Sequence, residues 1–240
     1  MIPARYDSTR FPAKVLAKAT GKYLIQHTYE QAMKAKLPSE VIVAADDDRI
    51  AAAVKVFGGR CVMTSEDHQS GTDRIAEVAQ GLTAPVVVNV QGDEPQIHPD
   101  QVEQVIQLLA DDREAVMGTL GHPIDSMTTW QDPNAVKVVV DERGYALYFS
   151  RSPIPYVRDA RDWLRETQVT PLRHLGIYSY RREFLLRYPT MPPSALEKTE
   201  KLEQLRALAA GCRIKVGVTP HKCLGIDTPE DLERWLAPYR

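Results

Sequence analysis

The feature that most constrains the fold is the run from Pro85 to Val90, in which four of the six residues are valine. An apolar run without polar alternation is typical of a strand buried on both faces, as in a parallel sheet covered by helices. A helix follows from about Pro99, because Val102, Val105 and Leu109 fall on one face at helical spacing. A strand followed by a helix is the repeating unit of α/β folds.

The same alternation precedes this run. Val41–Val43 is a candidate strand, and a helix begins at about Asp47. A short strand near Cys61–Met63 is followed by a helix that Ser70 can cap. Strands and helices that alternate at these intervals indicate a parallel sheet with helices on both faces.

The last third of the chain returns to this pattern. Ser194–Glu197 has the sequence of a capping box, which opens a predicted helix carrying Leu202, Leu205 and Leu208. A strand over 214–218 leads to a final helix with its cap at Thr228. We therefore predict an α/β fold built on a doubly wound, mostly parallel sheet.

The pattern changes at about 125–180. Val136–Val140 and Tyr145–Phe149 flank a turn sequence at 141–144, which predicts a β-hairpin. Arg173–Tyr180 is a further candidate strand. We interpret 125–180 as an antiparallel insert and a candidate dimer surface, so that residues 1–240 form a single domain.

Composition excludes several classes of protein. The chain has 240 residues, 26% charged and 43% hydrophobic, which is ordinary for a globular protein. A net charge of −2 provides no positive field to attract nucleic acid, and the apolar runs are far shorter than the ~20 residues that span a bilayer. The chain also opens without a secretory leader pattern. Three widely spaced cysteines suggest neither a disulfide framework nor a zinc motif. We expect a cytoplasmic protein without nucleic-acid or membrane partners.

Cations gather in the first loop. Residues 1–22 contain five Lys or Arg residues against a single acid, Asp7. All five cations come after a very short first strand. Ligands of open α/β sheets bind outside the carboxyl ends of the strands, where this loop lies. The cations therefore either bind a polyphosphate or form a solvated basic loop; charge alone favours neither. The chain has no P-loop or dinucleotide-binding glycine motif.

Two acids follow strands. Asp93 comes directly after the strand at 85–90, and Asp227 precedes the last helix. Either could serve in a turn or cap, but Thr228 is the expected cap, so Asp227 is not needed for that purpose. Carboxylates at strand ends can hold Mg²⁺ against substrate phosphates. The pair is consistent with phosphoryl or nucleotidyl transfer.

Two histidines have neighbours that could carry chemistry. His174 and Tyr178 lie four residues apart, so on a strand they share a face; the alternative is an ordinary half-buried sheet face. His68 and Ser70 are a weak candidate for a nucleophile pair, because no nucleophile elbow surrounds the serine.

Taken together, these segments resemble the 3-deoxy-manno-octulosonate (Kdo) cytidylyltransferases. The resemblance runs in order along nearly the whole chain, over residues 2–14, 67–74, 91–95, 134–139, 145–151, 173–178, 202–206 and 227–231. It implies a nucleotide-diphospho-sugar transferase-like fold and a cytoplasmic homodimer. The implied reaction is CTP + Kdo → CMP-Kdo + pyrophosphate, with Mg²⁺, for lipopolysaccharide biosynthesis. A related sugar acid, 8-amino-Kdo or a sialic acid, is the alternative substrate. A non-catalytic nucleotide-binding protein is disfavoured because both aspartates are present.

The resemblance also assigns site residues. It implies nucleotide binding by Ala4, Arg5, Lys14, Ser70, Arg74, Gln91 and Asp93, and metal binding by Asp93 and Asp227. It implies that Arg10, His174, Tyr178, Glu203 and Gln204 hold the sugar acid. Lys14, Asp93, Asp227 and Arg10 are the implied catalytic residues.

The chain departs from the family pattern in its first loop. Ala13 stands where the family has glycine, and Val15 where it has proline. The family's first strand is also longer, so either this strand is short or residues lie upstream of it. Because Pro12 fixes its own φ, we expect Pro12 and Ala13 to form the centre of a type I turn, with Ala13 at negative φ.

Overall fold

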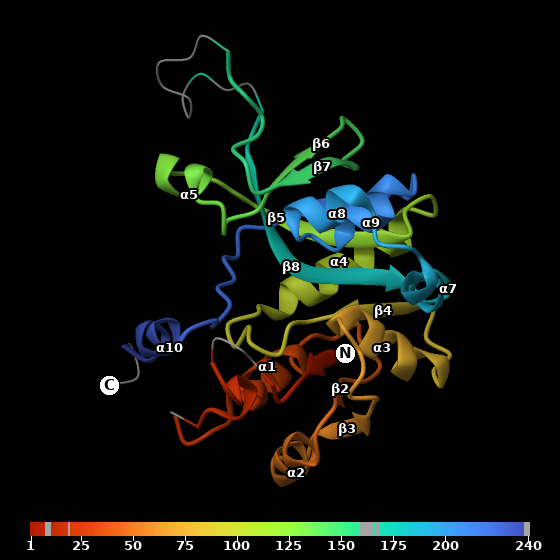
Figure 1. The fold of residues 1–240 in the computed structure, drawn as a ribbon, viewed down its shortest axis with the longest axis vertical. Coiled ribbons are helices and arrows are strands. Elements are labelled where there is room, and N and C mark those ends of the chain that lie inside the picture. Colours follow the sequence, from red (N-terminus) through yellow and green to blue (C-terminus); the bar gives the residue numbers. More distant parts are fainter. Residues whose placement is uncertain (8–10, 19, 159–165, 167–168, 238–240) are drawn as a thin grey trace.

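The computed structural model describes residues 1–7, 11–18, 20–158, 166 and 169–237 of the chain (Figure 1). Arg10, which the resemblance assigns to the sugar-acid site, lies outside these described residues. The strands form a three-stranded and a six-stranded sheet. Backbone contacts of Met1 join the two.

The first sheet contains β1 (Ile2–Ala4), β2 (Ile42–Ala45) and β3 (Arg60–Met63), all parallel. On its other side β1 meets β4 (Val86–Asn89). The Met1 amine donates to the carbonyl of Val88 (2.7 Å), and the Val90 amide donates to the carbonyl of Met1 (3.0 Å). In a parallel pair, one residue forms hydrogen bonds to the two residues that flank the residue opposite it, as Met1 does with Val88 and Val90. β4 therefore continues the sheet beside β1 and runs parallel to it.

The second sheet continues from β4. β8 (Leu172–Arg181) is antiparallel to both β4 and β5 (Met117–Pro123), and β9 (Ile214–Val218) is parallel to β5. Because β8 opposes both of its neighbours, β4 and β5 run in the same direction. The predicted mostly parallel sheet is therefore confirmed, with β8 as its reversed strand.

The hairpin predicted after residue 135 is confirmed. It consists of β6 (Lys137–Val140) and β7 (Ala146–Ser150), with Gly144 at φ 78° in the connecting turn. β6 pairs with the first residues of β8. We call the continuous sheet of β3, β2, β1, β4, β8, β5 and β9 the main sheet. The predicted antiparallel insert at 125–180 is divided, because β6 and β7 project from the main sheet whereas β8 lies inside it (Figure 1).

Helices cover both faces of the main sheet. The helices of the described residues are α1 (Leu24–Ala32), α2 (Asp48–Val56), α3 (Gly71–Gln80), α4 (Pro99–Asp111), α5 (Met127–Gln131), α7 (Arg182–Arg187), α8 (Ala195–Glu200), α9 (Gln204–Ala209) and α10 (Pro229–Leu236); α5 and α10 lie to one side of the sheet (Figure 1). Short 3₁₀ helices span Lys14–Leu16 and Tyr188–Thr190. Within the described residues, no helix has the length and apolar character needed to cross a bilayer.

Strand β2 is buried on both faces, whereas in the valine-rich β4 Val86 and Val88 are only partly buried. Ile42 and Ala44 join one hydrophobic cluster with residues of α3 and α7. Val43 and Ala45 join the other, with residues of α1, α2 and α4. All four side chains are at most 1% exposed. Both faces of the strand are therefore core, as expected for a doubly wound sheet.

The prediction of a single helix after Ser194 is wrong. Its capping box is present, but Lys201 adopts a left-handed conformation at φ 54° and ends α8. The chain then restarts as α9 at Gln204. The break lets Leu202 and Leu205 both enter the core while Glu203 stays between them.

The pairing of β8 with β5 is irregular. Their register shifts between Thr119 and Leu120, opposite the stretch from His174 to Tyr178. The buried Thr119 hydroxyl lies 2.8 Å from the carbonyl of Ile177 and 3.0 Å from His174 Nε2. A hydroxyl has one proton, so Thr119 donates to the carbonyl and accepts from the His174 ring N–H. Burial lowers the pKa of His174 from 6.5 to about 3, which keeps its ring neutral.

The expected conformation of Ala13 is wrong. The Lys14 amide donates to the carbonyl of Phe11 (3.2 Å), which closes a turn over Pro12 and Ala13. However, Ala13 has φ 53°, the left-handed region. A positive φ at the third residue is the feature of a type II turn, where glycine is favoured. This turn leads directly into the 3₁₀ helix that carries Lys14, so the position of Lys14 depends on a conformation that costs alanine roughly 1–2 kcal/mol.

We therefore predict that Ala13→Gly raises the free energy of unfolding by about 0.5–1 kcal/mol, because relief of the left-handed strain exceeds the added entropy of the unfolded chain. Urea denaturation measures this. The matched control is Ala52→Gly, at an exposed position inside α2, which should lower stability by about 1 kcal/mol. A similar loss in both variants would contradict the positive φ at position 13.

A second prediction concerns pH. His174 is neutral in the folded protein down to a pKa of about 3, whereas the unfolded chain binds a proton below about 6.5. The stability of the protein should therefore fall as the pH drops below 6.5, and His174 contributes about 1.4 kcal/mol per pH unit to that slope. His174→Gln keeps a donor for Thr119 but cannot titrate. Urea denaturation between neutral and mildly acidic pH should give a shallower slope for this variant; identical slopes would argue against a neutral His174.

Candidate active site

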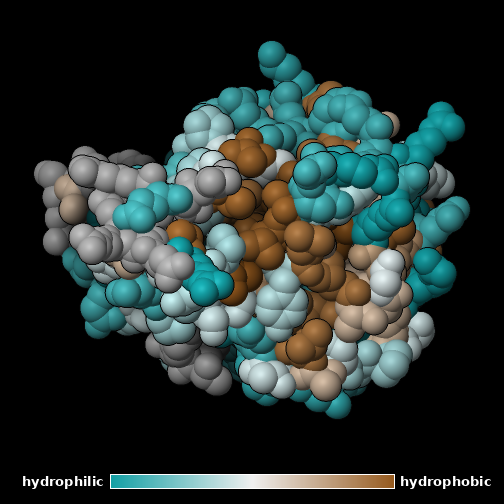
Figure 2. Space-filling view, turned by 90° about the horizontal axis from the view of Figure 1, so that it is seen from above, coloured by the Kyte–Doolittle hydropathy of each residue, from teal (hydrophilic) through white to brown (hydrophobic). Residues whose placement is uncertain are grey.

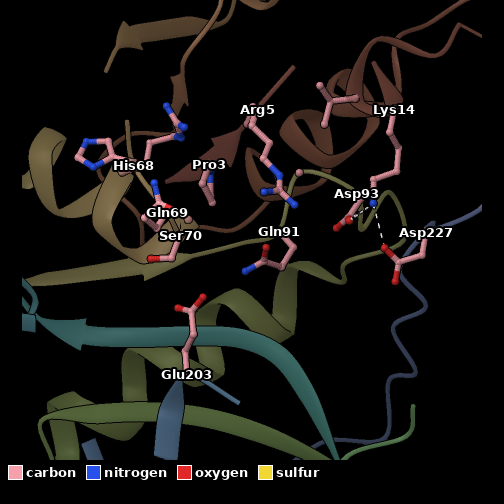
Figure 3. A pocket seen from close by; sticks show the side chains of 15 residues that line it. Pro3, Arg5, Lys14, His68, Gln69, Ser70, Gln91, Asp93, Glu203 and Asp227 are labelled. Atoms are coloured by element: carbon pink, nitrogen blue, oxygen red, sulfur yellow. Dashed lines mark hydrogen bonds and ion pairs between the residues drawn. The ribbon is translucent and has the colours of Figure 1, made fainter. Parts of the chain in front are cut away.

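A polar cavity of about 310 Å³ lies at the carboxyl ends of β1 and β4 (Figure 3). Nine predicted site residues line it: Ala4, Arg5, Lys14, Ser70, Arg74, Gln91, Asp93, Glu203 and Asp227. Sequence reasoning missed Pro3, Val15, Gln69, Gly71 and Gly92 as lining residues and named His68 only as a weak nucleophile candidate. Arg5 reaches into the cavity toward Gln91, and Glu203 points into it from the opposite side.

The ammonium group of Lys14 is the electrostatic centre of the cavity. Its Nζ lies 2.5 Å from Asp93 Oδ2 and 3.0 Å from Asp227 Oδ1. The Lys14 side chain is 10% exposed, against 25% for Asp93 and 47% for Asp227. The two carboxylates therefore face one point from separate segments, and a mostly buried cation neutralises them there.

Local structure fixes both aspartates. The Ile226 amide donates to the carbonyl of Asp93 (2.9 Å), which ties the segment before α10 to the loop after β4. Thr228 caps α10 in a capping box with Asp231, so Asp227 is not the cap, as its sequence context predicts. Ile226 also packs with α10 against α1. Asp227 is thus held at the cavity by the segments on both sides of it.

Gly92 allows the two strand ends to meet. A Cβ at this position would lie 3.1 Å from the carbonyl oxygen of Pro3, a backbone atom that cannot move aside cheaply. The absence of a side chain brings the loop after β4 against β1. Gln91 and Asp93 on either side are thereby placed on the cavity wall.

The start of α3 forms another wall. Ser70 Oγ accepts the Asp73 amide (3.1 Å) and caps the helix, as predicted. The His68 ring is hydrogen-bonded to Glu77, and this bond is the main cause of the lowered pKa of that carboxyl. Both side chains are therefore engaged in structural contacts rather than in a nucleophile pair. The amino end of a helix favours bound anions, which suits a phosphate-binding wall.

Arg74 is held from behind the cavity. Its guanidinium, on a residue only 3% exposed, donates to Asp46 Oδ2 (2.9 Å) and Thr64 Oγ1 (2.6 Å). Asp46 Oδ1 also accepts the Tyr6 amide (3.0 Å). Asp46 thus links the first loop to Arg74, a role that sequence reasoning missed. Asp46 could have been found from its position directly after β2, because an acid just after a strand is also the feature that marks Asp93.

Among the residues predicted to hold the sugar acid, those that the structure describes lie away from the phosphate-binding wall. Glu203 lines the cavity and accepts the Thr72 hydroxyl (3.1 Å); burial raises its pKa. The rings of His174 and Tyr178 lie 5.3 Å apart on one face of β8, as predicted, but neither lines the cavity itself. Burial raises the pKa of Tyr178, so it remains a neutral hydroxyl.

Gln204 carries an unusual feature. The residue is only 4% exposed, and within the described part of the chain its Nε2 has no hydrogen-bond partner. A buried amide without a partner costs free energy unless a ligand or water satisfies it. Gln204 follows Glu203 directly in the chain but does not itself line the cavity.

The donor set of Asp93 and Asp227 fits Mg²⁺. This ion binds oxygen, and proteins hold it through one or two carboxylates together with substrate phosphates and water. Here two carboxylates converge on a cation, the Lys14 ammonium, beside a cavity with room for phosphates.

Comparisons with known proteins agree with this geometry. A match to the cytidylyltransferase family covers residues 1–214. The 3-deoxy-manno-octulosonate cytidylyltransferase of Geobacter sulfurreducens is 54% identical over 241 residues, 98% of this chain and 96% of the relative. The protein of the same name from Solibacter usitatus is 49% identical over 234 residues, 98% and 91% of the two chains.

Solved structures give the same result. CMP:2-keto-3-deoxy-manno-octonic acid synthetase complexed with CTP superposes with a TM-score of 0.93 at 46% identity, over 99% of this chain and 96% of that one. A cytidylyltransferase from Leptospira borgpetersenii shares the fold alone, at 16% identity and a TM-score of 0.61, over 98% and 82% of the chains. With nearly its whole length matched, this chain belongs to the cytidylyltransferases, which are nucleotidyltransferases, and among them to the 3-deoxy-manno-octulosonate cytidylyltransferases.

Proposed function

We propose that the chain transfers the CMP group of CTP to Kdo and releases pyrophosphate. The observation that carries the proposal is the convergence of Lys14, Asp93 and Asp227 beside a cavity lined by further cations. A relative at 54% identity bears the name of this activity, and a solved structure that matches the fold holds CTP.

The nucleotide side is the wall built from β1, α3 and β4. Arg5 presents a planar guanidinium and Lys14 a compact ammonium, the two cations that proteins use for polyphosphates. The start of α3 at Ser70 and Gly71 adds the favourable field of a helix amino end. We assign the phosphates of CTP to this wall.

The sugar side is the wall around Glu203. Kdo presents several hydroxyls, which the Glu203 carboxylate and the unpartnered Gln204 amide can bind as acceptor and donor. The neutral His174 and Tyr178 provide further hydrogen-bonding groups on the adjacent face of β8. Arg10, which lies outside the described residues, is the proposed partner of the Kdo carboxylate.

Mg²⁺ is the proposed cofactor, and Asp93 and Asp227 would hold it. Bound there, the ion would polarise the α-phosphate and neutralise charge on the leaving pyrophosphate. In the reaction, the anomeric hydroxyl of Kdo attacks the α-phosphorus of CTP. The bond between this phosphorus and the oxygen that bridges the α- and β-phosphates breaks, and pyrophosphate leaves. This chain contributes by orienting the two substrates, with Lys14 beside the phosphates.

Pyrophosphate release from CTP and Mg²⁺ tests the substrate assignment, with Kdo, 8-amino-Kdo and a sialic acid as alternative acceptors. Kdo should give the highest kcat/KM, and UTP in place of CTP should give little product. Higher kcat/KM with another sugar acid would replace Kdo as the substrate, and no release with any acceptor would overturn the proposed reaction.

The place of the reaction in the cell is also a proposal. We infer that CMP-Kdo supplies lipopolysaccharide synthesis, because an activated sugar must be consumed by a transfer reaction. The three cysteines, Cys61, Cys212 and Cys223, are all free, which is consistent with a reducing cytoplasm.

We further propose that the chain forms a homodimer through the face that carries the β6–β7 hairpin and α8. Leu147 of β7 is 61% exposed and Leu196 of α8 is 44% exposed. Figure 2 shows hydrophobic residues gathered at the centre of the face that contains these elements. β7 is also an edge strand of its sheet. Apolar patches beside an open strand edge favour association with another chain.

We predict that Asp227→Asn lowers kcat by about a hundredfold or more, because metal-ion stabilisation of the transition state is worth several kcal/mol. The melting temperature should change little, since Thr228 and not Asp227 caps α10. Thr228→Ala is the matched control: it should cost about 1 kcal/mol of stability but keep most of the activity. Near-normal turnover of Asp227→Asn at limiting Mg²⁺ would remove Asp227 from the metal site.

For the dimer, we predict that Leu147→Asp yields a monomer, because a charge at the centre of an apolar interface would have to be buried unpaired. Light scattering after gel filtration measures the mass. The control is Val56→Asp on α2, where valine is 75% exposed and far from the hairpin in sequence and structure. The proposed interface is wrong if the two variants have the same mass as the parent.

A further inference from the structure

His98, Asp100 and His221 form a cluster outside the cavity, and the proposed reaction does not use it. His98 is the N-cap of α4, Asp100 lies in its first turn, and His221 belongs to the segment between β9 and α10. The two imidazole rings stack with centroids 3.7 Å apart. Ligand atoms of the three residues lie within 4.8 Å of one another, the one such group of three found among the described residues.

The distances from Asp100 to the two imidazoles are compatible with metal coordination as well as with the long hydrogen bond between Asp100 and His221. Asp100 Oδ2 lies 3.3 Å from His221 Nε2 and 3.4 Å from His98 Nδ1. Charge-assisted hydrogen bonds between nitrogen and oxygen are usually about 2.7–2.9 Å long. Two ligands bound tetrahedrally at about 2.0–2.1 Å lie roughly 3.3–3.4 Å apart. Both separations therefore match the edge of a tetrahedral site.

We propose that His98, Asp100 and His221 bind a divalent transition-metal ion, with Zn²⁺ as the best match and water as the fourth ligand. Two imidazole nitrogens and one carboxylate are donors that suit zinc, copper or nickel, whereas Mg²⁺ prefers oxygen alone. This chemistry separates the new site from the pair of aspartates in the cavity.

Coordination requires a small local rearrangement. A nitrogen lone pair lies in the plane of its ring, so the two stacked rings must tilt toward each other; both side chains are partly exposed, at 43% and 33%, which leaves room. The Asp100 amide, 3.2 Å from His98 Nδ1, loses its acceptor. The other half of the capping box, from the His98 amide to Gln101 Oε1, remains (2.9 Å). Because the rings must tilt and one capping hydrogen bond is lost, we expect the cluster to bind the metal ion with moderate affinity.

The position of the cluster gives the ion a structural consequence. His98 lies five residues after Asp93, and His221 lies six residues before Asp227. The two segments already contact each other, because the Gln101 side chain donates to the carbonyl of His221 (3.2 Å). A bound ion would add a link between the segments that carry the two aspartates. It should therefore raise the melting temperature of the protein by mass action.

Zinc titration tests the proposal. Calorimetry of the full chain in excess Mg²⁺, which occupies oxygen-only sites, should detect one Zn²⁺ per chain and a matching rise in melting temperature. His98→Asn, which keeps a good N-cap residue, and His221→Gln should each weaken Zn²⁺ binding by about tenfold or more. The matched control is His122→Gln on β5, whose ring contacts the carbonyl of Thr219 beside the same segment.

The variants distinguish the possible results. Loss of affinity in His98→Asn and His221→Gln, with His122→Gln unchanged, supports the site. Parent-like affinity in both variants overturns it. Zinc binding that excess Mg²⁺ abolishes also overturns it, because such binding belongs to Asp93 and Asp227.

Discussion

The interaction on which the site depends is the contact of the Lys14 ammonium with Asp93 and Asp227. These residues are 79 and 213 positions away in the chain, yet both carboxylates reach a side chain that is only 10% exposed. A cation so buried is stable only when it is paired. The parallel strands β1 and β4 place Lys14 and Asp93 at one edge of the sheet, and the bond from the Ile226 amide to the Asp93 carbonyl places Asp227 beside them. The fold thus brings charges together that no local structure could assemble.

Features encoded by short stretches could be predicted from the sequence. The valine-rich β4, the hairpin at 137–150 and the capping residues Ser70 and Thr228 are all confirmed. Each depends on residues within a few positions of one another, so propensity and periodicity suffice. Asp93 and Asp227, which the sequence also singles out, meet at the Lys14 ammonium, and their metal-binding role stays a prediction.

Features decided by distant contacts could not be predicted in this way. The place of β8 between β4 and β5 depends on pairing across about a hundred residues, although its strand character was evident. The break at Lys201 separates the exposed Leu196 from Leu202 and Leu205, which pack in the core against residues distant in the chain. For Ala13 the signal is the glycine that the family has there, because Pro12 alone is compatible with both type I and type II turns.

The paired state of Lys14 has a consequence for how ligands bind. In this structure its charge already neutralises two carboxylates, so a polyphosphate gains less from Lys14 than from an unpaired ammonium. A divalent cation at Asp93 and Asp227 would replace Lys14 as their partner and leave the ammonium to a phosphate. A polyphosphate would in turn supply further oxygen ligands to the cation. Each ligand therefore removes a cost of binding the other, and because such coupling is reciprocal, we infer that nucleotide and Mg²⁺ bind cooperatively.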